Sequence, residues 1–156
     1  MRQATQAVTQ EVTEKSASEL QGILVDVIDL GLQGKQAHWN VVGPLFRTVH
    51  LELDELVDDA HQWADDVAER MRALGAAADG RPGVILRQSG IPPMPEGIIA
   101  DCDVLSRVGE ELAAITERCK AAIARLDGRD KGSEDVLIGV IKGAEKHLWM
   151  FQSQHV

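Results

Sequence analysis

Four stretches of the chain, separated by glycine and proline, carry apolar residues at the spacing of an amphipathic helix. They predict helices at about residues 16–39, 44–74, 98–126 and 133–152. Gly75 and Gly128 mark two of the helix ends, and Pro44 suits the first turn of the second helix. No run alternates like a strand, so the chain is predicted to be all-α.

The longest interruption, residues 76–96, holds three Gly and four Pro around a short apolar piece, which predicts a crossover connection with one small helix. Four helices with one long connection between the second and the third match a ferritin-like four-helix bundle better than an up-and-down bundle. The predicted organisation is a polar N-terminal tail at 1–15, the bundle domain at 16–152 and a short C-terminal tail at 153–156.

Composition and charge narrow the class of protein. A chain of 156 residues suffices for one domain to bury a core without disulfides or a structural metal. The net charge of -9 argues against a general attraction to nucleic acid or anionic lipid and favours cations. The two cysteines are too far apart on one predicted helix to pair, and neither a signal peptide nor a membrane span is apparent, so a cytoplasmic protein is expected.

One stripe of the second predicted helix carries potential metal ligands. At about 100° of rotation per residue, these ligands fall within roughly 100° of one another, apart from the apolar face. They are His50, Asp54, Asp65 and Glu69. His50 and Asp54 lie four residues apart, as do Asp65 and Glu69, so each pair leaves the same side of adjacent turns and forms half of a site.

The two half-sites cannot meet within one helix, because Asp54 and Asp65 are separated by about 16 Å of helix. A second copy of the chain must therefore complete the site. Suppose that two copies of the second helix cross antiparallel about a two-fold axis. A residue of one copy then faces the residue of the other copy that lies equally far from the axis on the opposite side in sequence. His50 then faces Glu69, and Asp54 faces Asp65, which makes two identical sites per dimer.

A hairpin between the first two helices brings His38 level with His50 and adds a fifth ligand. Two histidines and three carboxylates form a mixed nitrogen and oxygen set that suits iron, although Zn, Mn or Co would also fit. The alternative for this set is a polar dimer seam held by histidine–carboxylate salt bridges.

At these positions the sequence resembles the Dps family of mini-ferritins. Its ferroxidase signature is matched by residues 35–54, KQAHWNVVGPLFRTVHLELD, and 65–70, DDVAER, and EKHLWMFQ on the last helix also fits. The resemblance covers about residues 16–152. It implies a dodecameric shell built from two-fold dimers, with two iron ions at each intersubunit centre. It also implies oxidation of Fe(II) by hydrogen peroxide or oxygen and storage of ferric mineral inside.

The resemblance also suggests roles for residues outside the five ligands. It implies that Trp39 lies beside the di-iron centre, although a core or interface aromatic explains this residue equally well. It further implies that the acidic start of the last helix lines three-fold iron pores. The pore candidates are Asp127, Asp130, Glu134 and Asp135.

Two further groups lie on the second helix. Asp58 and His61 face each other across the same predicted two-fold axis, which predicts an ion pair or an auxiliary cation site near the ferroxidase centres. A separate acidic stripe is by default a solvated helix face, and in a hollow shell it would line the cavity and nucleate mineral. Its members are Glu52, Glu55, Asp59 and Asp66.

The predicted function is therefore iron storage and detoxification by ferroxidase activity. A nucleoid-compacting DNA-binding protein is the main alternative, but Arg2 and Lys15 are the only basic residues of the predicted N-terminal tail. A dimeric metal-dependent enzyme on a ferritin-like scaffold is the third reading.

Overall fold

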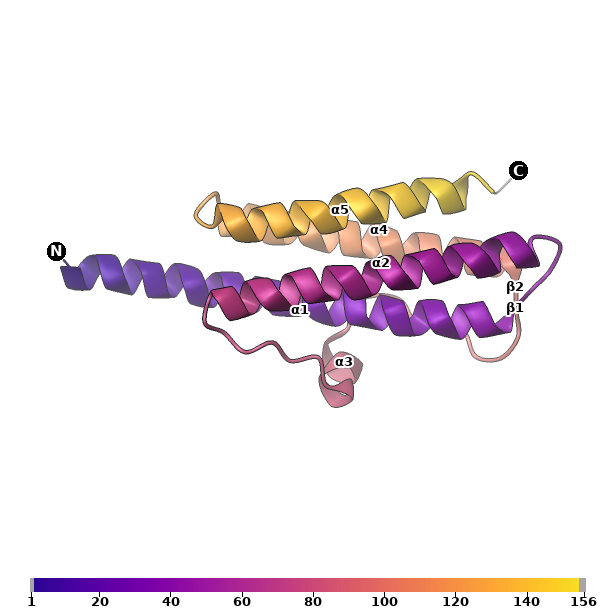
Figure 1. Ribbon diagram of the computed structural model, residues 1–156, viewed down its shortest axis with the longest axis horizontal. Helices are drawn as coiled ribbons and strands as arrows, with labels where there is room; N and C mark the ends of the chain where they lie inside the picture. Colours follow the sequence, from indigo (N-terminus) through magenta and orange to yellow (C-terminus); the bar gives the residue numbers. More distant parts are fainter. Residues whose placement is uncertain (1, 155–156) are drawn as a thin grey trace.

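The computed structural model describes residues 2–154, with side chains from residue 9 onward. In chain order its elements are α1 (Arg2–Asn40), β1 (Val41–Val42), α2 (Phe46–Ala73), α3 (Pro82–Gln88), β2 (Ile99–Ala100), α4 (Asp101–Leu126) and α5 (Lys131–Gln152). Helices α1, α2, α4 and α5 lie side by side as a bundle, and α3 lies to one side within the long connection (Figure 1). The predicted four-helix bundle with its short extra helix is confirmed.

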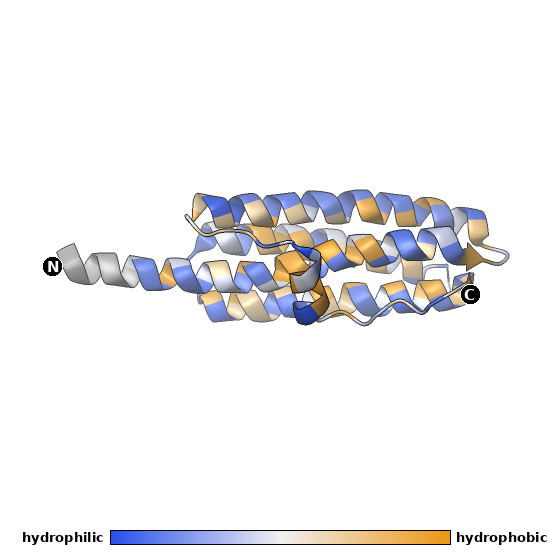
Figure 2. Ribbon diagram, turned by 90° about the horizontal axis from the view of Figure 1, so that it is seen from below, coloured by the Kyte–Doolittle hydropathy of each residue, from blue (hydrophilic) through white to orange (hydrophobic). Residues whose placement is uncertain are grey.

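A continuous apolar core fills the bundle. Apolar residues recur between polar ones along the long helices (Figure 2), as expected for helices that each bury one face. The largest apolar side chains that are fully buried include Leu20, Leu30, Leu53, Leu56, Met71, Leu112, Ile115, Leu137 and Phe151. In the described part of the chain, no helix combines the length and the apolar character that a membrane span requires.

The first helix begins earlier than predicted. It starts at Arg2 rather than Ser16, so the segment predicted as a polar tail is helical where it is described. The turns before Ser16 extend beyond the other helices (Figure 1), and from Thr9 to Lys15 no side chain is buried. Good helix formers such as Gln, Glu and Ala continue the backbone ladder without an apolar face. Met1 and residues 155–156 of the predicted tails lie outside the described residues.

The turn after α1 also differs from the prediction. Pro44 precedes α2 instead of opening it, because β1 first pairs in parallel with β2, with Val41 opposite Ile99. Helix α4 correspondingly begins at Asp101, later than the predicted start near residue 98. This short pairing joins the α1–α2 hairpin to the start of α4.

A buried carboxylate and its arginine partner anchor the long connection to the bundle. Asp26 on α1 is fully buried and accepts hydrogen bonds of 2.9 Å from the Arg118 guanidinium and from the backbone N–H of Gly90. Burial raises the pKa of Asp26 to about 6. A Cβ at Gly90 would lie 1.4 Å from the Arg118 guanidinium, so the connection can approach this pair only through glycine.

Candidate metal centre

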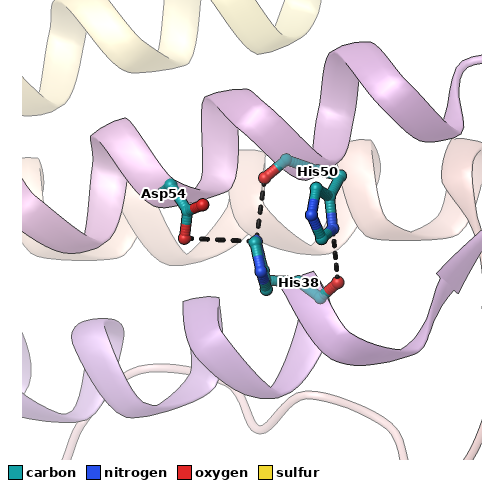
Figure 3. Close-up of side chains that lie close together, drawn as sticks. All are labelled: His38, His50 and Asp54. Carbon is teal, nitrogen blue, oxygen red and sulfur yellow. Dashed lines mark hydrogen bonds and ion pairs between the residues drawn. The ribbon is translucent and has the colours of Figure 1, made fainter.

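The hairpin between α1 and α2 brings three of the predicted ligands together. His38 comes from the end of α1, and His50 and Asp54 come from the first turns of α2 (Figure 3). One ligand atom of each lies within 4.8 Å of the others, and among the described residues no other trio of His, Cys, Asp or Glu does so. The two imidazole rings stack with their centroids 3.7 Å apart.

Each histidine orients the other. His38 Nδ1 donates to the carbonyl oxygen of His50, and His50 Nδ1 donates to the carbonyl oxygen of His38, both at 2.9 Å. Because a carbonyl oxygen can only accept, each Nδ1 carries a proton, which leaves Nε2 of a neutral imidazole as the nitrogen that can bind a metal. Imidazoles that ligate metals are held in this way, with the second ring nitrogen bonded to backbone or carboxylate oxygen.

Lys35 is a member of the site that the sequence reasoning missed. Its ammonium pairs with Asp54, and this hydrogen bond is the main reason why the pKa of Asp54 lies below its ordinary value. Asp54 Oδ1 also lies 3.2 Å from His38 Nδ1. A metal that binds Oδ1 of Asp54 therefore competes with Lys35. Lys35 lies three residues before His38 on α1, so helical spacing could have placed it on the ligand face.

Replacing Lys35 by methionine is expected to tighten Co(II) binding by up to about fivefold, because an exposed ion pair is worth about 0.2–1 kcal/mol. Isothermal titration calorimetry of the metal-free protein measures this affinity. Lys142→Met is the matched control, since it removes the same charge from an exposed position on α5. Equal affinities for the two variants would contradict the competition between Lys35 and the metal.

The two other predicted ligands, Asp65 and Glu69, lie further along α2 and are exposed. About 16 Å of helix separates Asp54 from Asp65. Neither residue joins the ligand trio within the described part of the single chain. Their meeting with His38, His50 and Asp54 of a second copy stays a prediction.

Comparisons with known proteins identify the family. The family model of the ferritin-like domain matches residues 17–156. DNA protection during starvation protein 2 of Deinococcus radiodurans is 33% identical over 143 residues, which are 92% of this chain and 59% of that protein. The crystal structure of Dps92 from Deinococcus radiodurans is similar with a TM-score of 0.89 and 32% identity, covering 94% of this chain and 90% of that one. The chain belongs to the Dps family.

A second solved structure agrees with the assignment. Dps from Microbacterium arborescens, in its high iron form, is 33% identical with a TM-score of 0.87, covering 92% of this chain and 93% of that one. This Dps chain spans 59% of the length of DNA protection during starvation protein 2, less than two thirds of that relative.

The predicted neighbours of the candidate metal centre lie on the surface of the Dps chain. Trp39 is 69% exposed, so it is not a core aromatic within one subunit. Asp58 and His61 are also exposed, and the His61 ring covers Gly31, where a Cβ would lie 3.4 Å from the ring. The pairing of Asp58 with His61 across a two-fold axis stays a prediction.

The predicted pore residues divide into two kinds. Asp130 caps α5 by accepting from the backbone N–H of Ser133 at 3.1 Å. Glu134 is 7% exposed and accepts from the backbone of the α4–α5 turn. These bonds help to hold the turn. Asp127 and Asp135 are exposed, which leaves their carboxylates the more accessible of the four.

The predicted mineral-nucleation stripe divides in the same way. Glu55 and Asp66 are exposed, whereas Glu52 is 7% exposed and burial raises its pKa. Asp59 accepts a hydrogen bond of 2.7 Å from Nε2 of His147, a histidine on α5 that is 1% exposed. The sequence reasoning missed this partner, because nothing in helical spacing relates α5 to a particular residue of α2.

Proposed function

We propose that this Dps chain oxidises Fe(II) and stores the product as ferric mineral. The observation that carries the proposal is the cluster of His38, His50 and Asp54, in which one ligand atom of each residue lies within 4.8 Å of the others and each Nδ1 is bonded to a backbone carbonyl. Neutral imidazoles with carboxylate oxygens form a donor set that suits ferrous iron. The high iron form of the Microbacterium arborescens relative supports iron as the substrate.

A second copy of the chain supplies the remaining ligands in this proposal. With two α2 helices crossing antiparallel, Asp65 and Glu69 of the partner subunit complete each centre, and two-fold symmetry makes two centres per dimer. Large apolar side chains at Leu32 on α1 and Leu86 on α3 are 58% and 88% exposed, which favours burial by another subunit. We extend the arrangement to a dodecameric shell with iron entering through acidic pores.

In the proposed reaction, each of two ferrous ions loses one electron. One hydrogen peroxide molecule takes up both electrons and two protons, its O–O bond breaks, and two water molecules form. His38 and His50 hold iron without adding charge, while the carboxylates stabilise the additional positive charge of the ferric product. Two ferrous ions at one centre deliver both electrons together, so no hydroxyl radical is released.

Anaerobic Fe(II) loading followed by hydrogen peroxide or oxygen tests the proposal. Ferric absorbance is expected to rise faster than in buffer, and light scattering is expected to show a particle of shell size. A rate equal to that of buffer would contradict ferroxidase function. Activity in a dimer-sized particle would instead indicate a metal-dependent enzyme on the same bundle.

The Deinococcus radiodurans relative is named for DNA protection, and protection by direct binding of DNA would require attraction to phosphate. The net charge of -9 makes that attraction unfavourable for this chain. A gel-shift assay near physiological salt is therefore expected to show no retarded band. A retarded band that disappears with added salt would favour the nucleoid-compacting alternative.

We place the protein in the cytoplasm, where reducing conditions suit the free thiols of Cys102 and Cys119.

A further inference from the structure

Asp101, the first residue of α4, ties α4 to the hairpin that carries the histidines. Its Oδ2 accepts from the backbone N–H of Leu45 at 2.6 Å, and its Oδ1 accepts from the backbone N–H of Cys102 at 2.8 Å. The residue is 7% exposed, so water competes little for these bonds. One buried carboxylate therefore joins the residue before α2 to the first turn of α4.

Gly43 is matched to this carboxylate. A Cβ at Gly43 would lie 2.3 Å from Oδ2 of Asp101, and Gly43 has a φ of 136°, a conformation that residues with a side chain rarely adopt. The loop therefore closes over Asp101 only because position 43 has no side chain. The strand β1, which directly precedes Gly43, pairs with β2, and this pairing also holds the loop in place.

The position of this loop decides how the two histidines meet. His38 lies three residues before β1, and His50 lies five residues after Leu45. Each ring is oriented by the backbone carbonyl of the other, so the relative position of the two backbones sets both ring directions. A shift of the hairpin would move both Nε2 atoms at once.

We propose that Asp101 is a positioning residue for the metal centre. By holding Leu45 against the start of α4, it keeps the α1–α2 hairpin in the register in which the imidazoles of His38 and His50 lie together at the candidate metal site and bond each other's backbone. The inference rests on the proposed function, since it assigns to Asp101 the geometry of that same centre. Loss of a group that orients a metal ligand typically weakens metal binding by about 10- to 100-fold.

The test compares full-length, metal-free shells of the parent chain, Asp101→Ala, Asp101→Asn and Gly43→Ala. Two readouts are used: the dissociation constant and visible spectrum of Co(II), and the imidazole Nδ1–H resonances of the metal-free protein. Asp101→Ala is expected to weaken Co(II) binding by about tenfold or more and to speed solvent exchange of both Nδ1 protons. Asp101→Asn retains one carbonyl acceptor and should recover most of the affinity, whereas Gly43→Ala should resemble Asp101→Ala.

Asp26→Ala is the matched control, because Asp26 is another buried carboxylate that accepts from a backbone N–H, about 18 Å before His38 along α1. Its Co(II) affinity should equal that of the parent. The inference is overturned if Asp26→Ala loses as much affinity as Asp101→Ala, or if Asp101→Ala binds as the parent does. Should Asp101→Ala fail to fold, Asp101→Asn and Gly43→Ala decide the matter, and parental affinity in Gly43→Ala overturns the inference.

The two proposals fail in different ways. A parent chain that binds no Co(II) through imidazole nitrogen refutes the proposed metal centre. The Nδ1–H resonances need no metal, so they still show whether Asp101 holds the two histidines. Unchanged proton exchange in Asp101→Ala, beside normal Co(II) binding by the parent, refutes the positioning role alone.

Discussion

Replacing His38 and His50 together by alanine is expected to lower the initial rate of Fe(II) oxidation by at least about 100-fold, more than the loss of a group that only orients a ligand. Both nitrogen donors of the centre disappear, and of the three ligands that one chain contributes only Asp54 remains, paired with Lys35. Stopped-flow absorbance after peroxide addition measures the rate. Light scattering on the same samples shows whether the variant still assembles, which separates loss of the site from loss of the particle.

A complementary variant tests whether the centre is shared between chains. Asp65→Asn combined with Glu69→Gln is expected to be as inactive as the double histidine variant. In a dimer with one chain of each variant, one centre contains both sets of substitutions. The other centre is intact, because it takes its three ligands of the first set from one chain and the remaining two from the other chain. Random pairing in an equal mixture should therefore restore about one quarter of the parental activity.

The mixture distinguishes the shared centre from a centre within one chain. Co-refolding equal amounts of the two variants allows their dimers to form at random, whereas mixing finished shells does not and provides the control. Recovery in the co-refolded sample alone supports the antiparallel pairing of α2 helices. No recovery, with particles of normal size, would mean that Asp65 and Glu69 do not complete the site of a partner subunit.

Glu111→Gln is expected to stabilise the protein by up to about 5 kcal/mol at pH 8 and by about 1 kcal/mol at pH 5. Glu111 on α4 is fully buried, and neither carboxyl oxygen has a hydrogen-bond partner among the described residues. Burial, helped by the nearby charge of Asp29, raises its pKa from 4.5 to about 9. Between these values the folded state holds a proton that the unfolded state has released, so the free energy of unfolding falls as pH rises.

Urea unfolding followed by circular dichroism at several pH values, at one protein concentration, measures this effect. The neighbouring Glu110→Gln is the matched control, because Glu110 is exposed and its ion pair with Arg107 lies at the surface. Its stability should stay within about 0.5 kcal/mol of the parent at every pH. If Glu111→Gln and the parent lose stability in parallel as pH rises, Glu111 does not retain a proton in the folded state.

Features that depend on local periodicity could be predicted from the sequence. The spacing of apolar residues located the four long helices, and the spacing of His50 with Asp54 placed both on one side of α2. Both follow from helical geometry, which relates residues three or four apart regardless of the rest of the chain. The hairpin prediction succeeded for His38 because the turn at Gly43 is short and its two arms must run side by side.

Only the tertiary structure decided which distant side chains meet. The pairing of β1 with β2, the bond from Leu45 to Asp101 and the contact of His147 with Asp59 join segments that no local pattern relates. The burial of Glu111 likewise depends on the helices packed around it. The sequence by itself therefore determined the helices and the candidate ligands that share one face of α2, because both follow from the regular spacing of residues along a helix. The anchoring of the hairpin and the protonation of buried carboxyls arise from packing and desolvation, which exist only once the chain has folded.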